Sequence, residues 1–291
     1  MPTLITVSDA TAGPYGVTVG PDGALWFTLV HAGDLGRLAP DGRVDRFPVG
    51  AGPSLVTTGR DGALWLTLNQ GNAVCRVTSD GEVTTFPVPT PGAGPFGITA
   101  GPDGALWFTE LDADRIGRIT VAGEVTEFPL PTTGAYPSTI TAGPDGALWF
   151  TLNQGNAVGR ITVTGETTLF PLPTEAAAPV GITAGPDGAL WFVEIAAGQV
   201  GRITVAGEVT EFPLPDRACR PHAIAPATDG LWLTEWGTGR LAAVTPDGAV
   251  EEYELPGPAG SEPHGLVVGP DGTVHVALEI GAIARLGAGD R

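Results

Sequence analysis

The sequence predicts an all-β fold, a seven-bladed β-propeller of four-stranded antiparallel blades. The main observation is an internal repeat, because the block Gly-Pro-Asp-Gly-Ala-Leu-Trp-Phe-Thr, or a close variant, recurs along the 291 residues. A proline opens each copy, and successive prolines are 39 residues apart once and 42 residues apart five times. The opening prolines are Pro14, Pro53, Pro95, Pro137, Pro179, Pro221 and Pro263. A period of about 40 to 45 residues is typical of a propeller blade, and a closed ring of blades forms one domain, here residues 1–291.

Turn residues divide each repeat into four expected strands. In the repeat that opens at Pro95, the expected strands span 97–100, 105–110, 115–121 and 124–130. Asp103 and Gly104 lie between the first two strands and supply the positive φ angles that a tight hairpin needs. Pro131 ends the fourth strand, because proline cannot donate a hydrogen bond to the ladder. No segment shows the helical period of about 3.6 residues.

The seventh repeat lacks a fourth strand, and a spare strand precedes the first repeat. After Gly265 the chain offers three strand candidates and ends at Arg291. Residues 3–7 are apolar and β-branched and belong to no repeat. We therefore expect this N-terminal strand to complete the last blade, which closes the ring and removes its open sheet edge.

A tryptophan occupies one register of the second strand in six repeats. A large ring at the same place in successive blades is typical of packing between blades. We interpret His275, which stands there in the seventh repeat, as a packing or partly exposed residue. The six tryptophans are Trp26, Trp65, Trp107, Trp149, Trp191 and Trp232.

The charge balance excludes several classes of function. Asp and Glu number 32 against 14 basic residues, for a formal net charge of -18, so nucleic acid and anionic membranes are excluded as partners. All basic residues are arginine, which rules out a Schiff-base lysine. The two cysteines, in different repeats, predict neither a disulfide framework nor a zinc site. Apolar runs are short and the N-terminus has no signal pattern, so we expect a cytoplasmic protein, and as a closed ring a monomer.

Residues that depart from the repeat indicate where the function lies. In an up-and-down blade the first strand lines the channel. Its first residue and the last residue of the second strand lie at the same end of the sheet. The residue after each opening proline therefore lies on one rim, and two of the four histidines of the chain occur at this position in adjacent repeats. The residues at this position are Tyr15, Ser54, Phe96, Ser138, Val180, His222 and His264.

Two carboxylates join these histidines on the expected rim. Glu262 lies two residues before His264, and Glu279 ends the second strand of the same repeat. Two carboxylates with open positions suit a hard cation, so Mg²⁺ is favoured over Zn²⁺ in a cluster without thiolates. Alternatively, the histidines are zinc ligands, or an acid and a base. The convergence of these residues with His222 and Tyr15 is typical of a pocket.

Four further polar residues are interpreted as surface groups. Glu110, Glu194 and Glu235 share one register at the end of the second strand, where we expect an acidic rim. His31 follows the second strand of the first repeat, and we interpret it as a solvated loop residue beside the pocket. No nucleophile elbow, phosphate-binding loop or dinucleotide fingerprint is present.

Four short motifs carry a resemblance to a known family. They are Gly-Pro-Tyr-Gly-Val-Thr around Tyr15, Arg-Pro-His-Ala-Ile around His222, Glu-Pro-His-Gly around His264 and Ala-Leu-Glu ending at Glu279. These motifs, with repeat phrases along essentially the whole chain, are similar to those of the virginiamycin B lyases, which confer resistance to streptogramin B antibiotics.

The resemblance implies a Mg²⁺-dependent carbon–oxygen lyase that opens a cyclic depsipeptide at its ester without hydrolysis. The α-proton of the threonine whose oxygen carries the ester is removed, and the carboxylate of the phenylglycine end departs to leave a dehydrobutyrine residue. On this chain it implies His264 as the general base. It also implies Glu262 and Glu279 as the Mg²⁺ ligands. His222 and Tyr15 would position the substrate or assist.

Two other functions remain open, a metal-dependent lactonase and a non-catalytic ligand-binding propeller. Lactonase propellers usually count six blades, which favours the lyase. Two departures from the family pattern are expected near the rim. His275 replaces an aromatic residue, and the segment leading to Pro53 is three residues shorter than its later equivalents.

Overall fold

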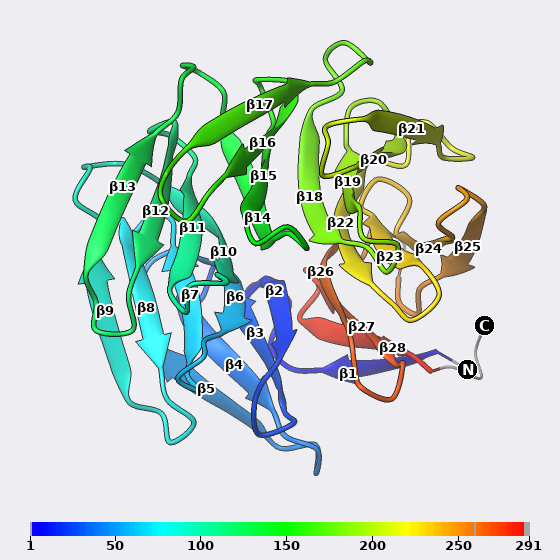
Figure 1. Ribbon diagram of the computed structural model, residues 1–291. Helices are drawn as coiled ribbons and strands as arrows, with labels where there is room; N and C mark the ends of the chain where they lie inside the picture. The colour runs from blue at the N-terminus through cyan, green and yellow to red at the C-terminus, as the bar shows by residue number, and fades with distance from the viewer. Residues whose placement is uncertain (1, 259, 288–291) are drawn as a thin grey trace.

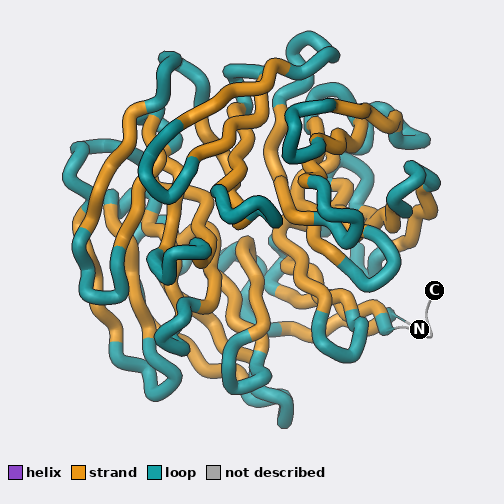
Figure 2. The backbone as a smooth tube through the Cα atoms, viewed as in Figure 1, coloured by secondary structure: helices purple, strands orange, loops and turns teal. Residues whose placement is uncertain are grey.

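The computed structural model describes residues 2–258 and 260–287, which form seven four-stranded antiparallel sheets arranged as blades around a central channel (Figure 1). The predicted seven-bladed propeller is confirmed. Only strands and loops occur in these two ranges (Figure 2), and no helix there is long and apolar enough to cross a membrane.

Six blades take their strands in chain order from the centre outward. Blade 1 contains β2 (Pro14–Val19), β3 (Leu25–Leu29), β4 (Asp34–Leu38) and β5 (Val44–Pro48). Blade 2 contains β6 (Pro53–Thr58), β7 (Leu64–Leu68), β8 (Ala73–Val77) and β9 (Val83–Pro87). Blade 3 contains β10 (Pro95–Ala100), β11 (Leu106–Glu110), β12 (Arg115–Ile119) and β13 (Val125–Pro129). Blade 4 contains β14 (Pro137–Ala142), β15 (Leu148–Leu152), β16 (Ala157–Ile161) and β17 (Thr167–Pro171). Blade 5 contains β18 (Pro179–Ala184), β19 (Leu190–Glu194), β20 (Gln199–Ile203) and β21 (Val209–Pro213). Blade 6 contains β22 (Pro221–Pro226), β23 (Leu231–Glu235), β24 (Arg240–Val244) and β25 (Val250–Glu254).

Blade 7 is closed by the N-terminal strand. It contains β26 (Pro263–Val268), β27 (Val274–Leu278) and β28 (Ala282–Leu286), and β1 (Thr3–Thr6) pairs antiparallel with β28. The register runs from Thr3 opposite Arg285 to Thr6 opposite Ala282, and Figure 1 shows β1 beside β28 in this blade. The predicted closure is confirmed, and β26 contacts β2 and β22 to complete the inner ring of strands.

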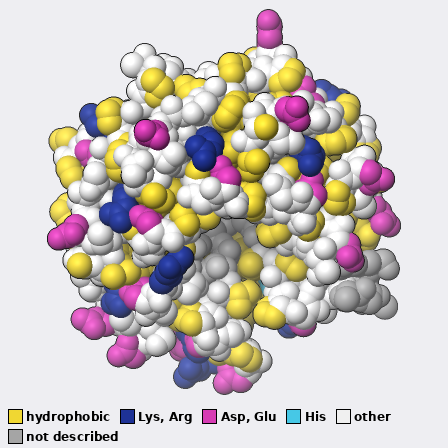
Figure 3. Space-filling model, in the orientation of Figure 1, with side chains coloured by type: hydrophobic (Ala, Val, Ile, Leu, Met, Phe, Trp, Pro, Cys, Tyr) yellow, Lys and Arg dark blue, Asp and Glu magenta, His cyan; other side chains and the backbone are white. Residues whose placement is uncertain are grey.

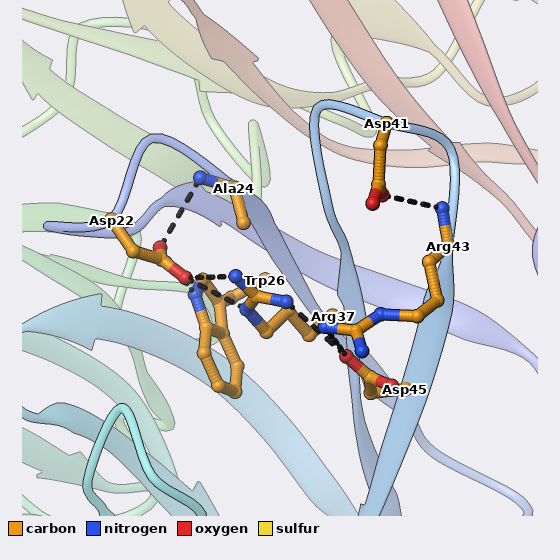
Figure 4. A network of polar contacts seen from close by, with 7 residues as sticks. All are labelled: Asp22, Ala24, Trp26, Arg37, Asp41, Arg43 and Asp45. Carbon is orange, nitrogen blue, oxygen red and sulfur yellow. Dashed lines mark hydrogen bonds and ion pairs between the residues drawn. The ribbon is translucent and has the colours of Figure 1, made fainter.

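A tryptophan-centred motif holds each regular blade to the next. In blade 1 the indole N–H of Trp26 donates to Asp22 at 3.1 Å, and the Arg37 guanidinium donates to the other oxygen of Asp22 at 2.7 Å (Figure 4). The Trp26 ring stacks on Phe47. The indole also packs into the core of blade 2. The bond from tryptophan to aspartate recurs in blades 2 to 5, which confirms the packing role predicted for this register.

His275 lies away from the rim on which we expected it. It is buried, and it lines a cavity of about 350 Å³ whose other walls include Asp271 and Arg285. Asp271 belongs to the turn between β26 and β27, at the opposite end of the blade from Glu279. Burial and the charge of Arg285 lower the pKa of His275 to about 4, so the ring is neutral at pH 7. The expectation that His275 borders the functional rim is therefore wrong.

The acidic rim predicted from three glutamates is also wrong. Glu110, Glu194 and Glu235 are each 0% exposed. The second strand lies between two other strands, and both of its faces pack against neighbouring blades, so its last residue is buried as well. Burial, with the charge of a neighbouring glutamate, raises the pKa of Glu110 to about 8. These carboxyl groups belong to the interior of the blades.

Candidate active site

A β-bulge turns the residue after each opening proline toward the channel. In blade 7 the register between β26 and β27 shifts between Pro263 and Leu266, and every other blade shows the same shift. A bulge re-aims the side chain that it contains. Tyr15 and His222 accordingly line the central cavity, which has a volume of about 360 Å³ and is otherwise largely walled by aliphatic residues. The space-filling view shows the hollow at the centre of the ring (Figure 3).

The residue before each opening proline adopts the left-handed backbone conformation. Glycine fills this position in the first three blades, whereas Tyr136, Ala178, Arg220 and Glu262 hold it in the last four, and Glu262 has φ 44°. This region costs a non-glycine residue roughly 1–3 kcal/mol. The strained backbone turns Glu262 onto the same rim as His264 and Glu279.

His264 and Glu279 form the closest polar pair of the rim. Nε2 of His264 lies 2.8 Å from Oε2 of Glu279, while Nδ1 of His264 is buried and has no hydrogen-bond partner in the part of the chain that the structure describes. The hydrogen bond from His264 lowers the pKa of Glu279 to about 2, so this carboxylate is ionised at pH 7. The pair resembles an orienting carboxylate and a base, because one ring nitrogen is held and the other is open.

Glu262, His264 and Glu279 can hold a metal ion together. One ligand atom of each residue lies within 4.8 Å of those of the other two. Two carboxylates provide the oxygen ligands and the negative charge that a hard divalent cation prefers. The donor set therefore fits Mg²⁺, and the single imidazole leaves a transition metal chemically possible.

Tyr15 and His222 complete the cluster from blades 1 and 6. The Tyr15 hydroxyl lies 3.2 Å from Nε2 of His222, and the ring centroids of Tyr15 and His264 are 4.6 Å apart. The centroids of His222 and His264 are 5.2 Å apart. Burial, together with His264, lowers the pKa of His222 to about 3, and burial raises the pKa of Tyr15, so both side chains are neutral at pH 7. The structure thus brings all five predicted site residues together.

His31 lies beside the site, as expected, but it also contacts a site residue, which we did not predict from the sequence. Its Nε2 lies 3.1 Å from Oε1 of Glu279, although its side chain is 56% exposed. No motif marks this histidine, because it lies one loop position beyond the repeat register of Glu279. The sequence gives one indication of this contact, because closure of the ring places the loop of blade 1 against blade 7. The shortened segment before Pro53 does lie on this rim, as the connection between β5 and β6.

The fold and the site can be compared with known proteins. The sequence matches the model of the virginiamycin B lyase family over residues 2–286. A virginiamycin B lyase of Streptomyces coelicolor is 67% identical over 46 residues, which cover 16% of this chain and 15% of that protein. One of Saccharopolyspora erythraea is 69% identical over 36 residues, or 12% of each protein. These two local matches span less than a fifth of either relative.

Solved structures match over nearly the full length. The selenomethionine-substituted virginiamycin B lyase from Staphylococcus aureus has a TM-score of 0.95 and 42% identity, with 98% of each chain covered. A catalytically inactive histidine-to-alanine variant of the S. aureus enzyme with quinupristin has the same TM-score, identity and coverage. The family match over residues 2–286 extends from β1 to the end of β28. The chain therefore belongs to the virginiamycin B lyase family.

Proposed function

We propose that this protein is a lyase that inactivates streptogramin B antibiotics by eliminating the ester bond that closes their depsipeptide ring. The observation that carries the proposal is the pair His264 and Glu279 beside the central cavity, with Glu262 within reach of both. Membership of the virginiamycin B lyase family and the likeness to a solved relative with quinupristin support a substrate of this class.

His264 is the base of the proposed reaction. In the tautomer whose Nε2–H donates to Glu279, the lone pair lies on the buried and open Nδ1. Nδ1 takes the α-proton of the threonine that carries the ester, and the electrons of this C–H bond form a double bond between Cα and Cβ. The bond from Cβ to the ester oxygen breaks, and its electrons leave with the carboxylate of the phenylglycine end. The product is a linear peptide with a dehydrobutyrine residue, and no water is consumed.

Glu262 and Glu279 are the proposed ligands of Mg²⁺. A proton next to a carbonyl is too weakly acidic for an imidazole alone, and bound Mg²⁺ supplies a Lewis acid for the developing negative charge. Glu279 is suited to this role because its low pKa keeps it charged, and Glu262 because its strained backbone directs it onto the same rim. Glu262 and Glu279 flank the open end of the β26–β27 hairpin, where the N–H of Glu279 donates to the carbonyl of Glu262 at 3.3 Å, and this pairing fixes their spacing.

His222 and Tyr15 position the antibiotic. Both are neutral at pH 7, so neither repels the cation or competes for the α-proton. Nδ1 of His222 is buried and unpaired within the described ranges, and it can accept from an amide N–H or donate to a carbonyl of the substrate, according to its tautomer. The phenol of Tyr15 packs against both imidazoles and limits where the reacting threonine can lie.

The mass of the product tests this proposal. Incubated with a streptogramin B compound and Mg²⁺, the protein should yield a linear isomer of unchanged mass. A product heavier by one water would indicate the lactonase, and an intact antibiotic would indicate a non-catalytic propeller. His264→Ala provides the control and should lower the rate by about 10²- to 10⁴-fold, with an unchanged melting temperature.

A further inference from the structure

His31 lies outside the five residues of the proposed site, yet its side chain is fixed onto one of them. His31 Nε2 contacts Oε1 of Glu279 at 3.1 Å, while His264 contacts Oε2 at 2.8 Å. The two imidazoles therefore hold opposite oxygens of one carboxylate. His31 follows β3 in blade 1 and Glu279 follows β27 in blade 7, so this contact crosses the seam of the ring.

The backbone around His31 holds its ring in this place. The N–H of His31 donates to the carbonyl of Ala12 at 3.1 Å, and the N–H of Val30 donates to the carbonyl of Gly13 at 2.9 Å. A Cβ on Gly13 would lie 2.5 Å from Cδ2 of His31, so a side chain at position 13 would displace the imidazole from this place. Gly13 is the counterpart of Glu262 in blade 1. One blade thus offers a carboxylate at this position, and the next leaves space for His31.

A histidine occurs at this loop position in blade 1 alone. At the loop position of His31 the other blades whose loops have the same length carry Gln70, Asp112, Gln154, Ala196 and Gly237. Gly52 and Gly94 lie against Gln70 and Asp112 in the same way, so the glycine by itself is not particular to blade 1. What distinguishes His31 is its contact with Glu279 across the seam of the ring.

We propose that His31 is a positioning residue that orients the Glu279 carboxylate for the divalent cation. The inference rests on the proposed function, which assigns this cation to Glu262 and Glu279. A ligand carboxylate is normally held by a hydrogen bond from outside the coordination sphere, and loss of such a partner weakens metal binding or activity about 10- to 100-fold. Because His31 and His264 hold different oxygens, Glu279 cannot rotate about its last torsion without breaking both contacts.

The first test measures Mg²⁺ affinity by titration calorimetry on the full chain without antibiotic. His31→Leu removes the ring nitrogens at similar size, and it should bind Mg²⁺ about 10- to 100-fold more weakly. His31→Gln keeps an N–H donor and should stay close to the wild type. Gln154→Ala changes the matching exposed position in blade 4 and should have no effect. With antibiotic present, excess Mg²⁺ should restore the rate of His31→Leu at an unchanged KM for the antibiotic.

The second test is a crystal structure of metal-free His31→Leu, which needs no cation. We expect Glu279 to leave its place against His264 or to occupy more than one rotamer. Unchanged Mg²⁺ affinity together with an unchanged Glu279 overturns the inference. If His31→Leu does not fold, His31→Asn is the replacement, because its side chain is too short to reach Glu279.

The two proposals fail in different ways. A wild type that binds Mg²⁺ but leaves the antibiotic intact refutes the proposed function, while weaker Mg²⁺ binding by His31→Leu still supports the inference. A wild type that opens the ring, with a His31→Leu variant that equals it in affinity and in the position of Glu279, refutes the inference alone.

Discussion

The hydroxyl of Thr234 donates a hydrogen bond of 2.9 Å to the backbone carbonyl of His264. The same hydroxyl accepts a bond of 3.0 Å from the N–H of Ala223, the residue that follows His222. One side chain of β23 therefore joins the bulge that carries His222 to the bulge that carries His264. The relative placement of the two imidazoles depends on this link between blades 6 and 7.

We predict that Thr234→Val lowers kcat about tenfold, because a catalytic base displaced by a fraction of an ångström loses its alignment with the substrate. The matched control is Thr109→Val, since the Thr109 hydroxyl makes the same two contacts in blade 3, with Gly97 and Ser138. Both variants should lose on the order of 1 kcal/mol in the free energy of unfolding, measured in urea. An equal loss of kcat in both would show that the link acts through stability alone.

Removal of Mg²⁺ is predicted to abolish turnover and to lower the melting temperature of the wild type. A ligand that binds only the folded chain stabilises it by about 2.7 kcal/mol at 100 times its Kd. Glu262→Gln should eliminate this Mg²⁺-dependent shift in calorimetry, because it removes one of the two carboxylate charges near the proposed cation. Glu82→Gln, an exposed change far from the rim, should keep the shift. A full shift in Glu262→Gln would argue against the proposed ligand.

Glu110→Gln is predicted to stabilise the protein in alkaline but not in acidic solution. The folded-state pKa of Glu110 is raised from 4.5 to about 8 by burial and by the charge of Glu127. The folded state therefore holds the proton more tightly than the unfolded chain, and its stability falls as the pH rises from about 4.5 to about 8. Melting temperatures should differ by a few degrees at pH 8, and little at pH 5. A constant difference across this range would exclude titration of Glu110 as the cause.

His275→Trp is predicted to raise the melting temperature by a few degrees and to leave turnover unchanged. Tryptophan would restore the residue found at this register in six blades and fill part of the 350 Å³ cavity beside His275. None of the five proposed site residues lines that cavity. The measurement is thermal unfolding alongside the kcat for a streptogramin B compound. A drop in kcat with a raised melting temperature would reveal coupling between the two ends of blade 7.

The sequence predicted the ring and its closure because both depend on local patterns. The repeat period predicted the number of blades. The spare strand at 3–7 could be assigned because the seventh repeat alone lacks a fourth strand. The observed β1 ends at Thr6, since the N–H of Val7 instead donates to Gly281 in a loop. Tyr15 and His222 were found by the same reasoning, because a bulge at a fixed repeat position gives every blade one residue that faces the channel.

Burial and contacts between blades could not be read from the repeat. Glu110 occupies a register at which other blades have leucine, and from this variation we expected a surface position. The structure instead buries the side chain, so the leucines indicated an interior position that also accepts a protonated acid. His275 was misplaced because its distance along the chain from Glu279 is short, although the two residues lie at opposite ends of one strand. His31 was undervalued because its partner is 248 residues away in the chain. The surroundings of these three residues depend on tertiary packing and not on the repeat period.

The strand that closes the ring also decides when the site comes into existence. Tyr15 and His31 leave the ribosome before His264 and Glu279, because blade 1 precedes blade 7 in the chain. The strand before Tyr15, β1, pairs with β28, which follows Glu279, so closure of the ring joins the two halves of the site. A chain that stops before Glu279 lacks one of the five groups, so turnover requires synthesis of the seventh blade as far as this residue. A circularly permuted chain with its ends moved to blade 4 would separate the two events, because blades 6, 7 and 1 would then be made in succession.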